Sequence, residues 1–356
     1  MTGAERGPIR VLLAEGSQAE RELLAYLLNA DSELQVAGVA LNGEQALAAA
    51  QRLHPDVILM DIHLPKMNGF VTTRKIMESC PTRILMMAAA DAPREVAQTF
   101  QTLEAGALTM VAKPRQPAHP DHQAAVRELL QTIKLMAEVP VVKRWKRAEK
   151  SGETCAPQRR ADTETGIGLV AVGASTGGPL VLQTILSRLP RGFAAPVLIV
   201  QHISAGFTGG LVEWLSRTSG FPVQVPEHGE RALPGIAYMA PDGSHMLVRA
   251  DGRIALSRTP PEHGMRPSVS ALFRSAAAEF GPRAVGVLLT GMGRDGAQEL
   301  KAMQQAGAVT MAQNKASSVV FGMPGEAQRL DAATYVLPPE GIAAMLEWIV
   351  TNRKGE

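Results

Sequence analysis

The sequence predicts an α/β protein made of two doubly wound parallel-sheet domains. Three observations support this prediction. The chain has 356 residues, short apolar runs alternate with segments of helical periodicity in both halves, and a basic polar stretch separates the halves. A chain of this length fits two domains better than one. We expect a first domain over residues 8–138, an interdomain linker over 139–164 and a second domain over 165–356.

In the first half, apolar runs predict buried strands, and leucines at helical spacing, from Leu23 to Leu28, predict a helix. The predicted strands cover 9–14, 36–40, 56–60, 84–88 and 108–111, and further predicted helices cover 44–53 and 121–137. Asp121 is expected to cap the last helix. The residues from Leu64 to Gly69 have the composition of a turn. Five such βα units predict a parallel sheet.

A change in composition follows, because Lys and Arg cluster with Ser, Gly, Thr and Pro over residues 143–160. This composition is typical of a solvated linker. A second βα series begins near Gly168. Its predicted strands cover 169–172, 197–200 and 284–289, its predicted helices cover 180–189 and 297–305, and residues 234–241 and 246–256 carry hairpin-like signals.

The composition argues against several classes of protein. A net charge of +2 argues against a nucleic-acid partner. No apolar run approaches the roughly 20 residues that span a bilayer, so no membrane insertion is expected. Residues 1–10 lack the apolar core of a signal peptide. With only Cys80 and Cys155, a disulfide framework is not expected, and we expect a cytoplasmic protein.

A glycine-rich segment, residues 173–178, lies between a predicted buried strand and a predicted helix. Its sequence, GASTGG, matches the nucleophile pattern G-x-S-x-G in the strand–turn–helix context that the pattern requires. The glycines allow a sharp turn that leaves the hydroxyl of Ser175 uncovered, and the helix N-terminus offers N–H groups to an oxyanion. The alternative is a glycine-rich turn that binds a phosphate or a dinucleotide.

Two further polar residues follow predicted strands of the same domain. His202 comes directly after the strand over 197–200, and Asp295 lies in the turn after the strand over 284–289. Taken alone, each has a structural alternative, a hydrogen-bonded histidine and a turn or N-cap aspartate. Because ligands and chemistry gather at the carboxyl edge of open parallel sheets, their coincidence with Ser175 favours a Ser–His–Asp triad. The order Ser, His, Asp disfavours an ordinary α/β-hydrolase, which runs Ser, Asp, His.

The second half resembles the catalytic domain of CheB-type protein-glutamate methylesterases. The matching stretches are VGASTGGP (172–179), IVQHI (199–203), PGIAYMAPDGSH (234–245), RPSVSALF (266–273), LTGMGRDGA (289–297) and VVFGMPGEA (319–327). The resemblance implies Ser175 as nucleophile, His202 as general base and Asp295 as the carboxylate that orients it. It also implies that Thr176 and Met292 line the site, although Met292 could equally be a packed apolar residue.

The activity that this resemblance implies is serine-dependent demethylation of glutamyl methyl esters on methyl-accepting chemotaxis receptors, with release of methanol. Family members also deamidate glutamine side chains. No cofactor is expected for catalysis. The eight histidines form no zinc pattern such as H-E-x-x-H.

The first half resembles a response-regulator receiver, which implies a flavodoxin-like fold. Asp61, at the end of a strand, occupies the position of the phosphoacceptor, and Lys113, before Pro114, that of the lysine that contacts the phosphoryl group. The resemblance implies Mg²⁺ at Glu15 and Asp61 and an upstream chemotaxis histidine kinase.

Two receiver features are missing. Gly16 stands where the family has a second acidic residue, and the segment around Ala88 lacks the usual Ser or Thr. We therefore expect a receiver fold whose phosphorylation and metal binding are impaired.

Two rival functions stay open at this point. The chain could be a catalytically idle signalling adaptor with a receiver-like binding surface, against which the complete set of triad residues argues. It could also be a dinucleotide-dependent oxidoreductase, although the glycines do not give the spacing G-x-G-x-x-G.

Overall fold

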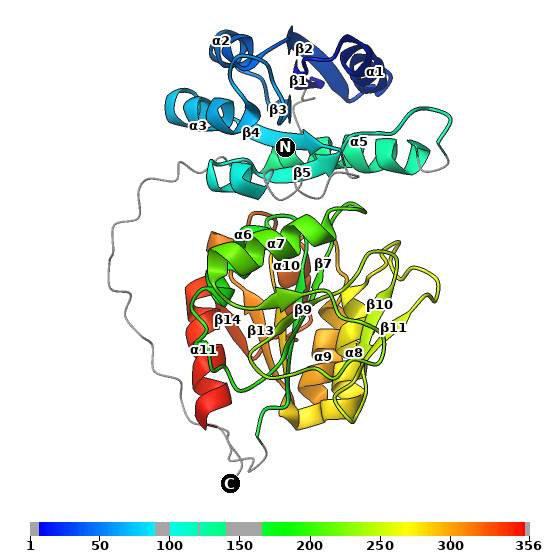
Figure 1. Cartoon of the computed structure of the whole chain (residues 1–356), viewed down its shortest axis with the longest axis vertical. Coiled ribbons are helices and arrows are strands. Elements are labelled where there is room, and N and C mark those ends of the chain that lie inside the picture. Colours follow the sequence, from blue (N-terminus) through cyan, green and yellow to red (C-terminus); the bar gives the residue numbers. More distant parts are fainter. Residues whose placement is uncertain (1–6, 90–99, 120–121, 140–165, 353–356) are drawn as a thin grey trace, which may run out of the picture. The chain divides into compact units, whose positions relative to one another are not determined.

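The computed structural model describes residues 7–89, 100–119, 122–139 and 166–352. These residues form two compact units, each with its own parallel sheet (Figure 1). The expected linker and Asp121 lie outside the described residues, apart from Val139, so the domain boundaries remain a prediction. Within the described ranges, no helix combines the length and apolar character needed to cross a bilayer.

The N-terminal unit is built around a five-stranded sheet in the order β2-β1-β3-β4-β5, with every neighbouring pair parallel. Its elements are β1 (Ile9–Ala14), α1 (Gln18–Asn29), β2 (Leu34–Ala40), α2 (Gly43–Leu53), β3 (Val57–Asp61), α3 (Gly69–Ser79), β4 (Arg83–Ala88), β5 (Thr109–Ala112) and α5 (His122–Glu138). Strand β3 is buried throughout, as its continuous apolar run predicts. The strand order reverses between β1 and β3, and ligands of doubly wound sheets bind at such a point.

Asparagine side chains start two helices of this unit. Asn42 Oδ1 accepts the N–H of Gln45 at 3.0 Å, and Asn68 Oδ1 accepts that of Val71 at 2.9 Å. The sequence pattern around residues 64–69 indicates only a turn, and the structure shows that helix α3 begins directly after Asn68. Strand β3 also begins and ends one residue later than predicted, so that it includes Asp61.

The C-terminal unit is built around a seven-stranded sheet in the order β14-β13-β12-β6-β7-β9-β8, again parallel throughout. Its elements are β6 (Leu169–Ala174), α6 (Gly178–Leu186), β7 (Val197–Gln201), α7 (Thr208–Ser219), β8 (Val223–Gln224), β9 (Ala237–Met239), β10 (His245–Val248), β11 (Ile254–Ser257), α8 (Val269–Phe280), η1 (Gly281–Arg283), β12 (Ala284–Leu288), α9 (Ala297–Gln305), β13 (Val309–Gln313), η2 (Lys315–Ser317), α10 (Met323–Arg329), β14 (Tyr335–Leu337) and α11 (Pro339–Asn352). The predicted fold class is confirmed for both units.

Of the two hairpins predicted from the sequence, one is confirmed and the other prediction is wrong. Residues 245–257 do form an antiparallel hairpin, β10 with β11, as predicted. The segment 234–241 instead contributes β9, a parallel strand between β7 and β8. All three residues of β9 are buried, and a short strand buried on both faces has no alternation of polar and apolar residues to reveal its partners.

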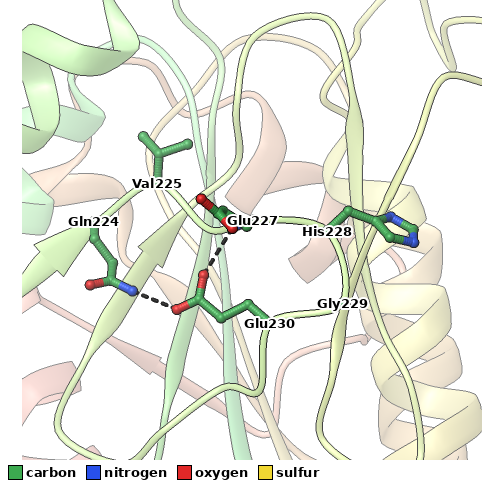
Figure 2. A pocket seen from close by; sticks show the side chains of 6 residues that line it. All are labelled: Gln224, Val225, Glu227, His228, Gly229 and Glu230. Carbon is green, nitrogen blue, oxygen red and sulfur yellow. Dashed lines mark hydrogen bonds between the residues drawn. The ribbon is translucent and has the colours of Figure 1, made fainter.

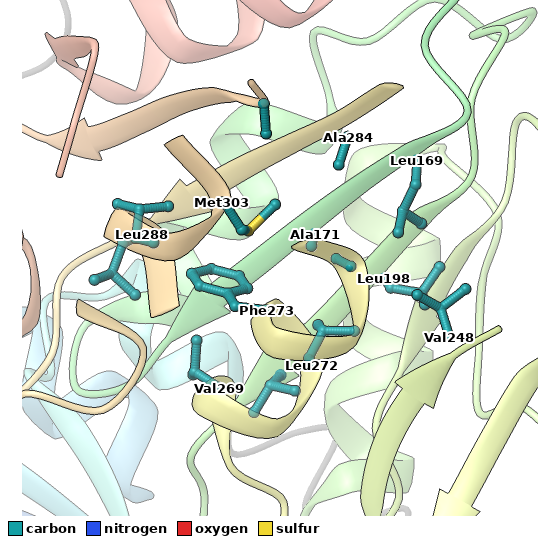
Figure 3. Packing of buried hydrophobic residues seen from close by; sticks show 14 of the residues in the cluster. Leu169, Ala171, Leu198, Val248, Val269, Leu272, Phe273, Ala284, Leu288 and Met303 are labelled. Atoms are coloured by element: carbon teal, nitrogen blue, oxygen red, sulfur yellow. The ribbon is translucent and has the colours of Figure 1, made fainter. Parts of the chain in front are cut away.

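The core of the C-terminal unit lies between the sheet and helices α8 and α9. Leu169 and Ala171 of β6 pack with Leu198 of β7, Phe273 of α8 and Met303 of α9 (Figure 3). All five side chains are fully buried. This packing holds α8 against the central strand.

Helix α8 begins close to the strand ends because two glycines leave room for it. A Cβ at Gly173 or at Gly296 would lie 2.3 Å from Cγ1 of Val269, the first residue of α8. Gly296 also has a φ of 82°, in the left-handed region that glycine tolerates. The N-terminus of α8 therefore lies next to the turn that contains Asp295.

Candidate functional site

The three candidate catalytic residues lie at the carboxyl edge of adjacent strands. Strand β6 is flanked by β7 on one side and β12 on the other. Ser175 comes one residue after β6, His202 comes one residue after β7, and Asp295 lies in the loop between β12 and α9. The order of the strands thus brings together residues that are far apart in the sequence.

Ser175 lies in the predicted turn between strand and helix. Its N–H donates to the carbonyl of Thr290 at 3.0 Å, and its own carbonyl accepts the N–H of Gly178 at 2.8 Å. Gly177 has a φ of 80°, and a Cβ there would lie 2.6 Å from the side chain of Val319. Because only glycine satisfies both demands, the sequence GASTGG adopts this turn and holds Ser175 at its tip, 9% exposed.

His202 and Asp295 form a direct hydrogen bond. His202 Nε2 lies 2.9 Å from Asp295 Oδ2, and both side chains are buried. The backbone N–H of His202 donates to the carbonyl of Ala174 at 2.9 Å, which places the histidine beside the residue that precedes Ser175. With Nε2 bound to the carboxylate, Nδ1 is the nitrogen available to accept a proton.

The N-terminus of α8 holds the carboxylate of Asp295. The backbone N–H groups of Val269 and Ser270 donate to it at 2.7 and 2.9 Å, and Ser268 Oγ lies 3.4 Å from Oδ1. Burial alone would raise the pKa of Asp295, but the bonds from His202 and Ser270 outweigh it and hold the pKa at about 2. Asp295 is therefore ionised at neutral pH, as an orienting carboxylate must be.

Thr176 and Met292 border the same site. The carbonyl of Thr176 accepts a bond from Thr290 Oγ1 at 3.0 Å. A Cβ on Gly291 would lie 2.6 Å from Cβ of Ser175, so the loop that continues into Met292 runs beside the serine. Met292 is 37% exposed, so it is not fully buried in the core.

Two residues to which the sequence alone assigned no role support this edge. The side chain of Gln201 bonds to the carbonyls of Ser175 and His202. Gln313, at the end of β13, accepts the N–H of Thr290 at 2.8 Å. Their position at the carboxyl ends of strands is the signal that could have identified them.

A surface pocket elsewhere in the C-terminal unit contains none of these residues. It is lined by Gln224, Val225, Glu227, His228, Gly229 and Glu230 (Figure 2). Both oxygens of Glu230 are already bonded, one by Gln224 Nε2 at 2.7 Å and the other by the N–H of Glu227 at 2.9 Å. These contacts stabilise the turn after β8 and give no reason to place the chemistry there.

In the N-terminal unit, the receiver-type residues gather around the ammonium of Lys113. Its Nζ lies 3.0 Å from Glu15 Oε2, 3.1 Å from Asp61 Oδ2 and 2.6 Å from Glu20 Oε2. The sequence analysis singled out Glu15 and Asp61 as residues of this site, whereas Glu20 became evident only in the structure. Burial alone would lower the pKa of Lys113, but its three carboxylate partners raise it above the ordinary value.

The two candidate metal ligands, Glu15 and Asp61, are both buried. Burial raises the pKa of Glu15, and the charge of Asp61 adds to this effect, against the lowering influence of Lys113. Among the residues that the structure describes, none forms a hydrogen bond with Asp61 Oδ1. The described residues contain no group of three or more His, Cys, Asp or Glu side chains suited to a metal.

Gly16 and Ala88 are the positions at which an acidic side chain and a hydroxyl are missing. A Cβ on Gly16 would lie 3.0 Å from Cδ of Pro65, so the proline occupies part of the space of the missing acidic side chain. Ala88 ends β4, next to β3, and offers no hydroxyl.

Comparison with known protein families and proteins agrees with this division. Residues 170–346 match the family described as CheB methylesterase, and residues 11–125 match the response regulator receiver domain. A crystal structure of the CheB methylesterase catalytic domain of Thermotoga maritima is 35% identical, with a TM-score of 0.51. It covers 52% of this chain and is itself covered completely.

Full-length relatives are similar along nearly the whole chain. The protein-glutamate methylesterase/protein-glutamine glutaminase 4 of Geobacter metallireducens is 51% identical over 339 residues, which are 95% of this chain and 98% of that protein. The corresponding protein 1 of Syntrophus aciditrophicus is 52% identical over 345 residues, 95% of this chain and 97% of that protein. Identity of this extent, over both units, shows that the chain belongs to the CheB family of protein-glutamate methylesterase/protein-glutamine glutaminases with a receiver domain.

Proposed function

We propose that this protein hydrolyses glutamyl methyl esters on methyl-accepting chemotaxis receptors and releases methanol. The names of its full-length relatives support the same activity, and also deamidation of protein glutamine. The single observation that carries the proposal is the bond between His202 and Asp295 at the strand end next to Ser175. Incubation with methyl-labelled receptor and measurement of released methanol tests it.

The proposed reaction begins with attack of Ser175 Oγ on the γ-carbonyl of the ester. His202 takes the hydroxyl proton on Nδ1, because its Nε2 is held by Asp295. Collapse of the tetrahedral intermediate expels methanol, which leaves with that proton. Water, activated by His202, then hydrolyses the acyl-enzyme to the glutamate carboxylate and free Ser175. The same steps on a glutamine side chain release ammonia.

Asp295→Asn is expected to lower the rate of ester hydrolysis by up to roughly ten-thousand-fold, the effect of the same change in a well-studied triad. An amide in this place favours the wrong tautomer of His202. Steady-state kinetics would measure the loss, with Asp251→Asn, in the exposed turn between β10 and β11, as the control. Unchanged kinetics would mean that Asp295 only shapes its turn.

Asp295→Asn should also change how the free energy of unfolding depends on pH, because it removes an ionisable carboxyl group. The pKa of Asp295 is about 2 in the folded protein, below the ordinary 3.8, so its contribution is complete above pH 3.8. That contribution, about 2 kcal/mol, is lost as the pH falls through 2. Chemical denaturation from pH 5 to pH 2 should show a smaller loss of stability in Asp295→Asn than in the wild type.

We propose further that the receiver unit regulates the esterase and that phosphorylation of Asp61 by a chemotaxis histidine kinase is weakened here. When bound, Mg²⁺ would offset the charge of phosphoryl transfer. Glu15 and Asp61 could hold it, with the unpaired Oδ1 of Asp61 as one ligand, because Mg²⁺ often takes only one or two protein carboxylates. Lys113 competes for the same two carboxylates, through Glu15 Oε2 and Asp61 Oδ2.

Small phosphodonors test whether phosphorylation of Asp61 activates the esterase. We expect them to raise the esterase rate little or not at all, because with Gly16 and Ala88 the site lacks an acidic ligand and a hydroxyl that would interact with the phosphorylated state. Activation would then come from a protein partner or from substrate binding. A large activation that disappears in Asp61→Ala would contradict this expectation.

Gly16→Asp is expected to restore the missing ligand. We expect Mg²⁺ to bind at least about tenfold more tightly, because loss of even an outer-shell partner costs roughly that factor at metal sites. Pro65 must move slightly, since a Cβ at residue 16 lies 3.0 Å from its Cδ. Titration calorimetry of the full chain would measure the affinity, and the double variant with Asp61→Asn should lose the gain. Equal affinity of the wild type and Gly16→Asp would contradict the idea that Gly16 weakens the site.

A further inference from the structure

The side chain of Gln201 connects the two loops that carry the proposed nucleophile and base. Gln201 is 4% exposed. Its Nε2 donates to the carbonyl oxygen of Ser175 at 2.8 Å and to that of His202 at 2.8 Å. An amide nitrogen has two hydrogens, so both are used. Because both partners are carbonyls, only this orientation of the amide group can satisfy them.

These bonds begin where the pairing of the strands ends. The last pair of β6 and β7 is Ala174 with Gln201, and the last bond runs from the N–H of His202 to the carbonyl of Ala174. Ser175 and His202 are the first residues beyond that pair. The chain then turns into α6 on one side and into a loop on the other. Gln201 therefore provides the connection between the two backbones that the sheet no longer provides.

The oxygen of the same amide carries a cost that the two donated bonds must offset. Gln201 Oε1 is buried and has no hydrogen-bond partner among the described residues. It faces Gly178, where a Cβ would lie 2.1 Å from it, and the next residue, Pro179, has no N–H to offer. A buried unpaired oxygen is costly, and an apolar side chain of equal length would avoid that cost. The benefit of the amide therefore lies in its two donors.

We infer that Gln201 is a positioning residue, which sets the distance between the hydroxyl of Ser175 and the imidazole of His202 by holding both carbonyls. The inference rests on the proposed function of this site. Gln201 acts through the two backbone carbonyls and not through the substrate, so its loss should affect the chemical step more than binding. A displacement of 1 Å in a catalytic group can cost on the order of a hundredfold in rate.

Gln201→Met tests this inference, because methionine has the same length and no donor. We expect kcat for ester hydrolysis to fall roughly a hundredfold while KM stays nearly constant. The rate at which a small organophosphonate labels Ser175 should fall by a similar factor. Thr310→Val is the matched control, since it removes a buried hydroxyl that bonds to Thr334. Thr310 lies near the start of β13, whereas Gln313, at the end of this strand, lies at the edge of the sheet that carries the site. Thr310→Val should lower the melting temperature without slowing labelling.

Gln201→Glu provides a second arm that does not depend on the methionine variant. A neutral carboxylic acid between two carbonyls donates one hydrogen bond, so we expect an activity between those of the wild type and Gln201→Met. As rising pH ionises the acid, its labelling rate relative to the wild type should fall. A merely structural role would not produce this dependence.

Three results would have distinct meanings. A folded Gln201→Met with kcat and labelling within about twofold of the wild type, far from the hundredfold expected for misplacement, would overturn the inference. A Gln201→Glu variant whose relative labelling rate is independent of pH would also contradict it. If the wild type itself neither hydrolysed the ester nor reacted with the organophosphonate, the proposed function would fail, whatever the variants showed.

Discussion

Replacement of Ser175 by alanine is expected to abolish release of methanol from methylated receptor. In a hydrolase with a comparable triad, loss of the serine lowers kcat by on the order of a million-fold, because no other group forms the acyl-enzyme. The fold should be unaffected. The turn depends on the backbone bonds of Ser175 and on Gly177, which this substitution leaves in place.

The measurement is methanol release from labelled receptor, together with labelling of the protein by a serine-directed organophosphonate. Ser187→Ala is the control, since Ser187 caps the other end of the same helix, α6, and its exposed hydroxyl bonds only locally, to the carbonyl of Thr184. If Ser175→Ala kept more than about a tenth of the wild-type activity, Ser175 would not be the nucleophile, because a triad without its nucleophile has a far lower residual rate. The same result would favour the alternative function, a catalytically idle signalling adaptor.

Replacement of His202 by alanine is expected to be nearly as damaging. In the hydrolase cited above for loss of its serine, loss of the histidine alone lowers kcat about as much as loss of all three triad residues, again on the order of a million-fold. Without His202, Ser175 has no base, and the carboxylate of Asp295 stays buried with only its donors from α8. Stability should therefore fall as well, because the hydrogen bond at 2.9 Å is lost.

His228→Ala is a suitable control for this experiment, since His228 is exposed and lies in the turn after β8, outside the proposed site. Methanol release and reaction with the organophosphonate should both be slow in His202→Ala and normal in His228→Ala. Rapid labelling of Ser175 in His202→Ala would show that another residue activates the serine.

Local sequence patterns were sufficient for most of the elements around the site. The run over 9–14 and the helix over 297–305 match β1 and α9 residue for residue. The glycines of the turn that carries Ser175 were equally predictable, because the φ of 80° at Gly177 is a local backbone requirement, although the space beside Gly177 is limited by Val319, which is distant in the sequence. The order of strands and helices therefore follows from local preferences, and with it the α/β class.

Partners that are distant in the sequence required the tertiary structure. His202 and Asp295 are 93 positions apart, and the bond between them exists because β6 lies between β7 and β12. The same holds for β9, which lies parallel between β7 and β8. Its short apolar sequence does not show which strands it pairs with.

The sequence by itself thus determined the fold class, the position of Ser175 in its turn, and the absence of an acidic side chain at Gly16. Only the tertiary structure decided how the N-terminus of α8 holds Asp295, how Gln201 joins two loops, and that Glu20 shares Lys113. The physical reason is the range of the interactions. A turn or a helix is stabilised by neighbours along the chain, whereas these contacts depend on the sheet order and packing that bring distant segments together.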